Sequence, residues 1–146
     1  MNFIMLVGLP GAGKSTIAQK FTNKGYTILS PDQLRNELNI HEIDRIRDIL
    51  DILYEKLEQA IQNNDNIVYD STNLTVKRRR EVLDLLPDTY NKICYIVEVP
   101  IELCKKRNSH RIGYSKVSEE EYDRMEQVYT LPTLKEGWDE IIYLEE

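Results

Sequence analysis

The sequence is short of several features that would assign it to a specialised class of protein. Its apolar runs fall below the roughly 18 residues of a membrane-spanning helix, so we expect no membrane partner. The N-terminal segment lacks a basic region and a small-residue cleavage site, and it predicts a buried strand instead of a signal peptide. Linkers, repeats and low-complexity segments are also missing, which favours one domain over residues 1–146.

Cysteine is scarce as well, and acidic residues outnumber basic ones, 25 to 19. The two cysteines, Cys94 and Cys104, fall in a predicted strand and a predicted helix, and nothing else suggests secretion. We therefore expect free buried thiols and a cytoplasmic protein. The net charge of −6 argues against a surface coated with basic residues, but local charge at a site still permits a nucleic-acid ligand.

What the chain does contain is an alternation of apolar strands and amphipathic helices. Strands are predicted over residues 3–7, 26–29, 67–69, 92–99 and 141–144. Helices are predicted over residues 14–23, 30–39, 42–63, 75–86, 100–107 and 118–129. Strands separated by helices form a parallel sheet covered on both faces, so the pattern predicts a three-layer α/β fold with a five-stranded parallel sheet.

A glycine-rich loop follows the first predicted strand. Residues 8–16 read GLPGAGKST and meet the pattern G-x-x-x-x-G-K-[ST] between a strand and a helix. In this pattern backbone N–H groups converge on phosphate oxygens, the lysine reaches the β- and γ-phosphates, and the hydroxyl binds Mg²⁺. We therefore expect a nucleoside triphosphate, ATP or GTP, with Mg²⁺. Its phosphates would contact Gly8, Gly11, Ala12, Gly13, Lys14, Ser15 and Thr16.

A polar segment, DSTN (70–73), follows the third predicted strand. The carboxyl ends of parallel strands meet at one edge of a sheet, where ligands bind. Asp70 is expected to hold Mg²⁺ together with Ser15, through water, although the same composition is typical of a turn. Many P-loop motor ATPases carry a water-activating glutamate after this aspartate, so Ser71 in its place argues against a dedicated hydrolase.

A second polar pair follows the second predicted strand. Asp32 and Arg35 are three residues apart in a helix capped by Ser30, so they project from one face. A kinase needs a carboxylate that accepts the proton of the attacking hydroxyl, and Asp32 is the best-placed candidate. Arg35 would then bind a phosphate of the acceptor. Spacing alone also fits an acid that complements the helix dipole and a solvated arginine.

Two basic segments complete the candidate site. Arg107 and Arg111 in RNSHR are four residues apart, so one helical face would present both guanidinium groups to the γ-phosphate. A lid is predicted over about 108–118, although basic residues at a helix end also suit the dipole. The run KRRR (77–80) opposes the dipole at a predicted helix start, which suggests an anionic partner or a solvated face.

Together these motifs resemble the kinase domain of the bacteriophage-type 5′-polynucleotide kinases, over nearly the whole chain. The motifs with that order and spacing are GLPGAGKST, DQLR (32–35), DSTNL (70–74), RNSHR (107–111) and PTLKEGWDEI (132–141). The resemblance implies a P-loop NTPase fold of the adenylate-kinase-like kind with a small lid. It also implies a phosphotransferase that moves the γ-phosphate of a nucleoside triphosphate to the 5′-hydroxyl of a DNA or RNA end.

The resemblance further assigns roles to single residues. Lys14, Asp32 and Arg111 would be catalytic, with Asp32 as the general base and Arg111 acting from the lid on the γ-phosphate. Arg107 would lie near the nucleotide. The acceptor would contact Asp32, Arg35, Asp70, Thr72, Asn73, Arg78 and Arg79.

Two other functions are compatible with the sequence. Aromatic residues rarely interleave with the basic ones, and the net charge of −6 slightly favours a small acceptor such as a nucleoside, sugar, antibiotic or sugar-nucleotide. A nucleotide-dependent ATPase or switch is the third possibility, although it would not need the pair Asp32 and Arg35. No motif distinguishes ATP from GTP, DNA from RNA, or one oligomeric state from another.

Overall fold

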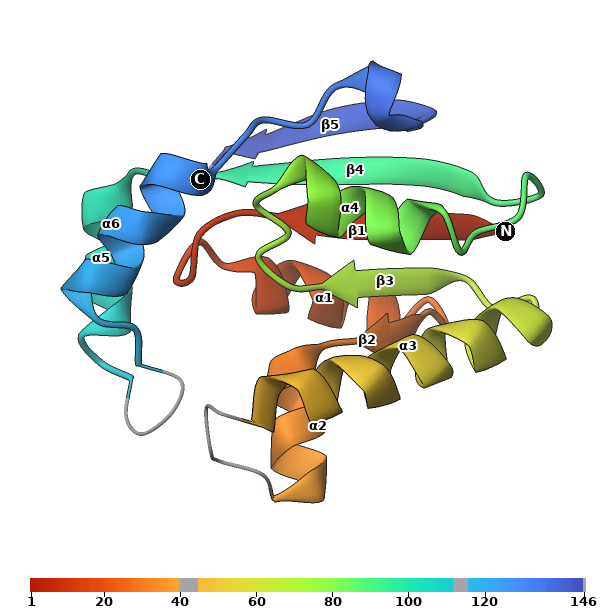
Figure 1. Ribbon diagram of the computed structural model, residues 1–146, viewed down its shortest axis with the longest axis horizontal. Helices are drawn as coiled ribbons and strands as arrows, with labels where there is room; N and C mark the ends of the chain where they lie inside the picture. Colours follow the sequence, from red (N-terminus) through yellow and green to blue (C-terminus); the bar gives the residue numbers. More distant parts are fainter. Residues whose placement is uncertain (40–44, 112–115, 146) are drawn as a thin grey trace.

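The computed structural model describes residues 1–39, 45–111 and 116–145, which form one parallel sheet surrounded by helices (Figure 1). The strands are β1 (Asn2–Val7), β2 (Thr27–Leu29), β3 (Ile67–Asp70), β4 (Asn91–Glu98) and β5 (Glu140–Glu145). Their order in the sheet is β2-β3-β1-β4-β5, and every pairing is parallel. The predicted α/β fold with a five-stranded parallel sheet is therefore confirmed.

The helices follow the predicted order, with small shifts at their ends. They are α1 (Lys14–Thr22), α2 (Pro31–Leu38), α3 (Ile46–Gln62), α4 (Val76–Leu83), α5 (Ile101–Asn108) and α6 (Glu119–Val128). The hydroxyl groups of Ser30, Thr75 and Ser118 cap α2, α4 and α6, as the sequence predicts. The predicted start of the third helix falls at residues 42–44, outside the described residues. A short 3₁₀ helix, η3 (Leu134–Glu136), was not predicted.

The two faces of the sheet bury separate cores, because successive strand residues point to opposite sides. Phe3, Met5 and Val7 of β1 pack with residues of α2, α3 and α4 on one face. Ile4 and Leu6 pack on the other face with residues of α1. The central strand is thus held from both sides, which fixes the position of the loop that follows it.

Helices α5 and α6 lie beyond the carboxyl edge of the sheet, the side to which the strand arrowheads point (Figure 1). A third cluster, Ala12, Val97, Cys104 and Tyr122, joins these two helices to the glycine-rich loop. Cys94 and Cys104 are buried and free, as expected. Across the three described ranges, every helix falls short of the length and apolar character that crossing a membrane requires.

A pair of leucine truncations tests the larger core. Leu57 of α3 is fully buried, whereas Leu131 is 50% exposed. We expect Leu57→Ala to lower the free energy of unfolding by about 2–5 kcal/mol, because it leaves a cavity. Leu131→Ala should change it by less than about 0.5 kcal/mol. Urea denaturation measures both, and equal effects would contradict this assignment of the core.

Candidate active site

The glycine-rich loop leaves β1 at the centre of the carboxyl edge. Gly11 and Gly13 have φ angles of 88° and 96°, a left-handed conformation that residues with a Cβ disfavour. A Cβ on Gly11 would lie 2.5 Å from the carbonyl oxygen of Cys104, so the loop packs directly on the backbone of α5. Helix α1 then begins at Lys14 with no acidic residue in its first turn. Its N–H groups and positive dipole end therefore suit an anion.

Lys14 lies inside the loop and is only 8% exposed. Its Nζ donates a hydrogen bond to the carbonyl oxygen of Leu9 at 2.8 Å. Burial lowers the pKa of Lys14 to about 8, and Arg111 lowers it as well, whereas Asp70 and Asp32 raise it. Asp70, Asp32 and Arg111 therefore all lie within electrostatic reach of the Lys14 ammonium group.

Asp70 ends β3 next to the start of α1. The hydroxyl of Ser15 donates to its Oδ2 at 3.3 Å, and the aspartate is 7% exposed. Burial raises the pKa of Asp70, an effect that Lys14 and the Ser15 hydrogen bond oppose and that Asp32 reinforces. The carboxylate is thus stabilised by the lysine that also lies in the loop.

The oxygens of Ser15 and Asp70 fit a magnesium ion that accompanies a nucleotide. Both are hard donors, and Mg²⁺ usually takes one or two protein oxygens and completes its shell with phosphates and water. No group of three or more His, Cys, Asp or Glu side chains within the described ranges forms a metal cage. The donor set therefore suits a metal delivered with a triphosphate, as the sequence predicts.

Asp32 and Arg35 lie on α2, directly after β2. The Ser30 hydroxyl accepts the N–H of Gln33 at 3.3 Å and fixes the start of this helix. Asp32 is exposed, and its charge raises the pKa of both Lys14 and Asp70, so it lies within electrostatic reach of these two residues. Arg35 is 7% exposed and is not the solvated residue that spacing alone allows.

The DSTN turn is tied to β1 and to the glycine-rich loop. The Gly8 N–H donates to the Thr72 carbonyl at 3.1 Å. The Asn73 side chain donates from Nδ2 to the Leu6 carbonyl at 2.8 Å, and this residue is 6% exposed. Both residues therefore shape the turn behind Asp70, and Asn73 presents little surface to an acceptor.

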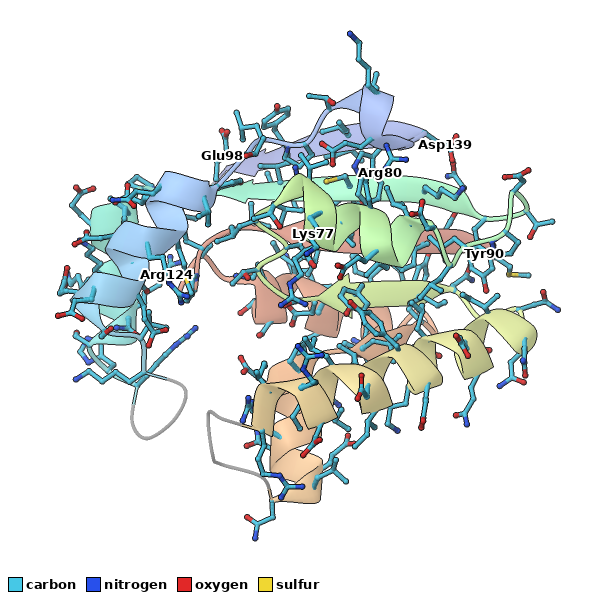
Figure 2. All side chains as sticks on the ribbon, viewed as in Figure 1. Lys77, Arg80, Tyr90, Glu98, Arg124 and Asp139 are labelled. Carbon is cyan, nitrogen blue, oxygen red and sulfur yellow. The ribbon has the colours of Figure 1, made fainter. Side chains whose placement is uncertain are left out.

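The four cations of α4 divide into two environments. Arg78 is exposed, as are Lys77 and Arg80, which extend from α4 in Figure 2. Arg79 is fully buried, and its Nε lies 2.7 Å from Oε1 of Glu136. The expected contact between Arg79 and an acceptor does not fit this placement, because the guanidinium is enclosed within the fold.

The RNSHR segment contacts the loop through α5. Nη1 of Arg107 donates to the Gly11 carbonyl at 3.1 Å. The Asn108 side chain pairs with Val117 through two hydrogen bonds, donating to its carbonyl at 2.6 Å and accepting its N–H at 2.8 Å. Arg111 acts on the pKa of Lys14. Of the predicted lid, residues 112–115 lie outside the described residues.

Two residues that support the site received no role in the sequence analysis. Tyr122 of α6 is fully buried, and its hydroxyl donates to the Pro10 carbonyl at 2.7 Å. Glu136 is the partner of Arg79 and closes a capping box with Thr133. The T-x-x-E spacing of that box is a local signal that could have been found. The tyrosine carries no such signal, because its contact spans 112 positions.

Comparison with known proteins extends this description. The model of an AAA domain family matches residues 3–132. A protein from Chloroflexus aurantiacus J-10-fl is 18% identical, with a TM-score of 0.74 over 99% of this chain and 84% of its own. A sugar kinase from Janibacter sp. HTCC2649 is 19% identical, with a TM-score of 0.70 over 99% of this chain and 85% of its own. A fungal RNA kinase is 16% identical, with a TM-score of 0.64 over 98% of this chain and 73% of its own. No curated protein matches the sequence.

Identities this low establish a shared fold and leave the acceptor open. The fold is shared with a sugar kinase and with a fungal RNA kinase, since both structures superpose on nearly the whole chain. The residues that match the family model make up most of the sequence. They include the glycine-rich loop and the DQLR, DSTN and RNSHR segments. The chain therefore belongs to the AAA domain family.

Proposed function

We propose that this protein is a kinase that moves the γ-phosphate of ATP, or of another nucleoside triphosphate, to the 5′-hydroxyl of a DNA or RNA end. The observation that carries the proposal is the placement of Lys14, the hydrogen-bonded pair Ser15–Asp70 and Asp32 at or after the carboxyl ends of three strands of one sheet, β1, β3 and β2. Lys14 belongs to the glycine-rich loop, and Asp32 is an exposed acid at the start of α2. The proposal therefore assigns binding of the phosphate donor to Lys14 and acceptance of the proton to Asp32.

In this proposal the side chains divide the work of an in-line transfer. Asp32 accepts the proton of the attacking hydroxyl while the hydroxyl oxygen forms a bond to the γ-phosphorus. The bond from that phosphorus to the β–γ bridging oxygen breaks, and the nucleoside diphosphate leaves. Lys14 and Arg111 stabilise the charge on the transferring group, and the N–H groups of the loop hold the β-phosphate.

Magnesium would be held by Ser15 and, through water, by Asp70, and when bound it neutralises charge on the phosphates. The same two residues also hydrogen bond to each other at 3.3 Å, so the donor atoms already lie close together. Arg35 is proposed to bind a phosphate of the acceptor. Exposed Arg78 is proposed to extend that contact along a polynucleotide.

A small-molecule kinase is the second candidate. The net charge of −6 disfavours a long polyanionic acceptor, and the superposed structures include a sugar kinase from Janibacter sp. HTCC2649 and a gluconokinase from Sinorhizobium meliloti 1021. The donor half and the general base would be unchanged in this alternative. Only the acceptor contacts from α2 and α4 would differ.

Transfer of a labelled phosphate tests the proposal. We expect γ-labelled ATP with Mg²⁺ to label a 5′-hydroxyl oligonucleotide in preference to nucleosides or gluconate. Asp32→Asn should lower kcat by about 10²–10⁴-fold, because the proton acceptor is lost. Asp51→Asn, at an exposed acid on α3, should leave kcat unchanged. Label only on a small acceptor would select the second candidate, and release of inorganic phosphate unaffected by Asp32→Asn would refute both.

Lys14 predicts a pH dependence of nucleotide affinity. Its pKa of about 8 in the free protein is raised when phosphates bind, so affinity is full below that pH and falls as pH rises through it. Above pH 8, the dissociation constant for ATP should rise by up to about tenfold per pH unit, measured by calorimetry. Lys14→Arg stays charged throughout and should show a flat profile. If the affinity for ATP changed with pH in the same way in the unmodified protein and in Lys14→Arg, titration of Lys14 would not be the cause.

The close approach of Gly11 to α5 predicts a local effect on phosphate binding. Gly11→Ala and Gly25→Ala both place a Cβ in the left-handed region, with φ of 88° and 83°. Only the first meets a backbone oxygen, at 2.5 Å, whereas nothing lies within 4 Å of the second. We expect Gly11→Ala to weaken ATP binding at least about tenfold and Gly25→Ala to cost only about 1–2 kcal/mol of stability. Equal ATP affinities would show that the loop tolerates the shift.

A further inference from the structure

Arg79 is a buried charge whose guanidinium makes three hydrogen bonds. It is 0% exposed, and its guanidinium donates from Nε to Oε1 of Glu136 at 2.7 Å and from Nη2 to Oε2 at 3.2 Å. The remaining Nη1 donates to the Asn73 carbonyl at 3.0 Å. A planar fork can make all three bonds at once, whereas the single ammonium of a lysine cannot. The side chain therefore joins η3 to the DSTN turn.

Glu136 is itself held in place by its own turn. Its Oε2 accepts the N–H of Thr133 at 2.8 Å, and the Thr133 side chain accepts the N–H of Glu136 in return. The carboxylate is 6% exposed, so it is a fixed and desolvated counter-charge for Arg79. The capping box therefore determines where the guanidinium can lie.

Asn73, at the other end of this link, adopts a left-handed backbone conformation. Its φ is 49°, in a region that asparagine enters more readily than most residues with a Cβ. Arg79 donates a hydrogen bond to the Asn73 carbonyl. The side chain of Asn73 in turn donates to the carbonyls of Leu6 and Ser71. Asp70 begins the same turn, and its Cα is paired in register with that of Leu6. The conformation of Asn73 thus governs the path of the chain away from Asp70.

We propose that Arg79 is a positioning residue for the phosphate-transfer site, where it acts through Asn73 on the carboxylate of Asp70. This inference rests on the proposed function. Arg79 touches neither nucleotide nor acceptor, and Glu136 is its anchor. The link makes the Ser15–Asp70 pair, the proposed magnesium donors, depend on a turn more than sixty residues further along the chain.

Stability alone is a weak explanation for this ion pair. Removing two charges from water offsets most of their attraction, and well-packed apolar side chains of similar volume often stabilise a protein more. A group that only filled the core would not need three directed hydrogen bonds, one of them to the backbone of the DSTN turn. These hydrogen bonds are instead suited to holding the DSTN turn in one conformation.

The test compares the effect of Mg²⁺ on nucleotide affinity in matched variants. A fluorescent ATP analogue is titrated with and without Mg²⁺ into the whole chain. Arg79→Lys keeps the charge, and we expect it to reduce the gain in affinity that Mg²⁺ provides by about tenfold, as for other residues that orient metal ligands. Arg80→Lys, at the exposed neighbour, should leave the gain unchanged. Asp70→Asn should reduce it strongly and leave the part of the gain that Ser15 provides.

The double variant separates positioning from general stability. If Arg79 acts through Asp70, adding Arg79→Lys to Asp70→Asn should cause no further loss of the Mg²⁺ effect. Leu57→Ala serves as the control for a fold destabilised elsewhere, and its Mg²⁺ effect should match that of the unmodified protein. An unchanged Mg²⁺ effect in Arg79→Lys, or additive losses in the double variant, would overturn the proposal.

Two further measurements keep the outcomes distinct. If Arg79→Lys does not fold, as judged by circular dichroism, Glu136→Gln replaces it and is subject to the same criteria. The labelled-transfer assay is run in parallel, and kcat should fall together with the Mg²⁺ effect. Absence of transfer in the unmodified protein would refute the proposed function, while the nucleotide titration would still decide whether Arg79 positions Asp70.

Discussion

The burial of β1 between two parallel neighbours is the constraint on which the rest of the structure depends. Five of its six residues are buried, and they alternate between the two cores. A strand held on both edges and both faces ends at a fixed point, and the glycine-rich loop starts there. Hydrogen bonds of Thr72, Asn73 and Tyr122 attach their own segments to the end of this strand or to the loop. The position of the candidate site is therefore determined by the central strand of the sheet.

The fold could be predicted because its signals are local. Apolar runs such as FIMLV and the spaced leucines of α3 mark buried strands and helix faces, and Ser30, Thr75 and Ser118 mark helix starts with their own side chains. The order of elements then leaves few right-handed arrangements of a parallel sheet. The limits of this reasoning lie at short elements such as η3, whose three residues form no periodic pattern.

The candidate site could be predicted only where motif and strand end coincide. The glycine-rich loop and Asp32 follow strands and Asp70 ends one, so the topology brings them together, and the effects of Asp32 on the pKa of Lys14 and Asp70 reflect that proximity. The arginines of α4 could not be separated in this way. Four consecutive cations look alike in sequence, and only a carboxylate 57 positions away decides that Arg79 turns inward while its neighbours stay in water. Long-range pairing of this kind has no local signature.

The two hydrogen bonds between Asn108 and Val117 have a consequence for the placement of α6. They bring the chain back to the point from which it left α5, so the residues between them start and finish at one place. The entropy of closing a loop grows only slowly with its length. Because Asn108 bonds Val117 directly, the chain that leads into α6 is positioned on α5 whatever the length of the segment that connects them.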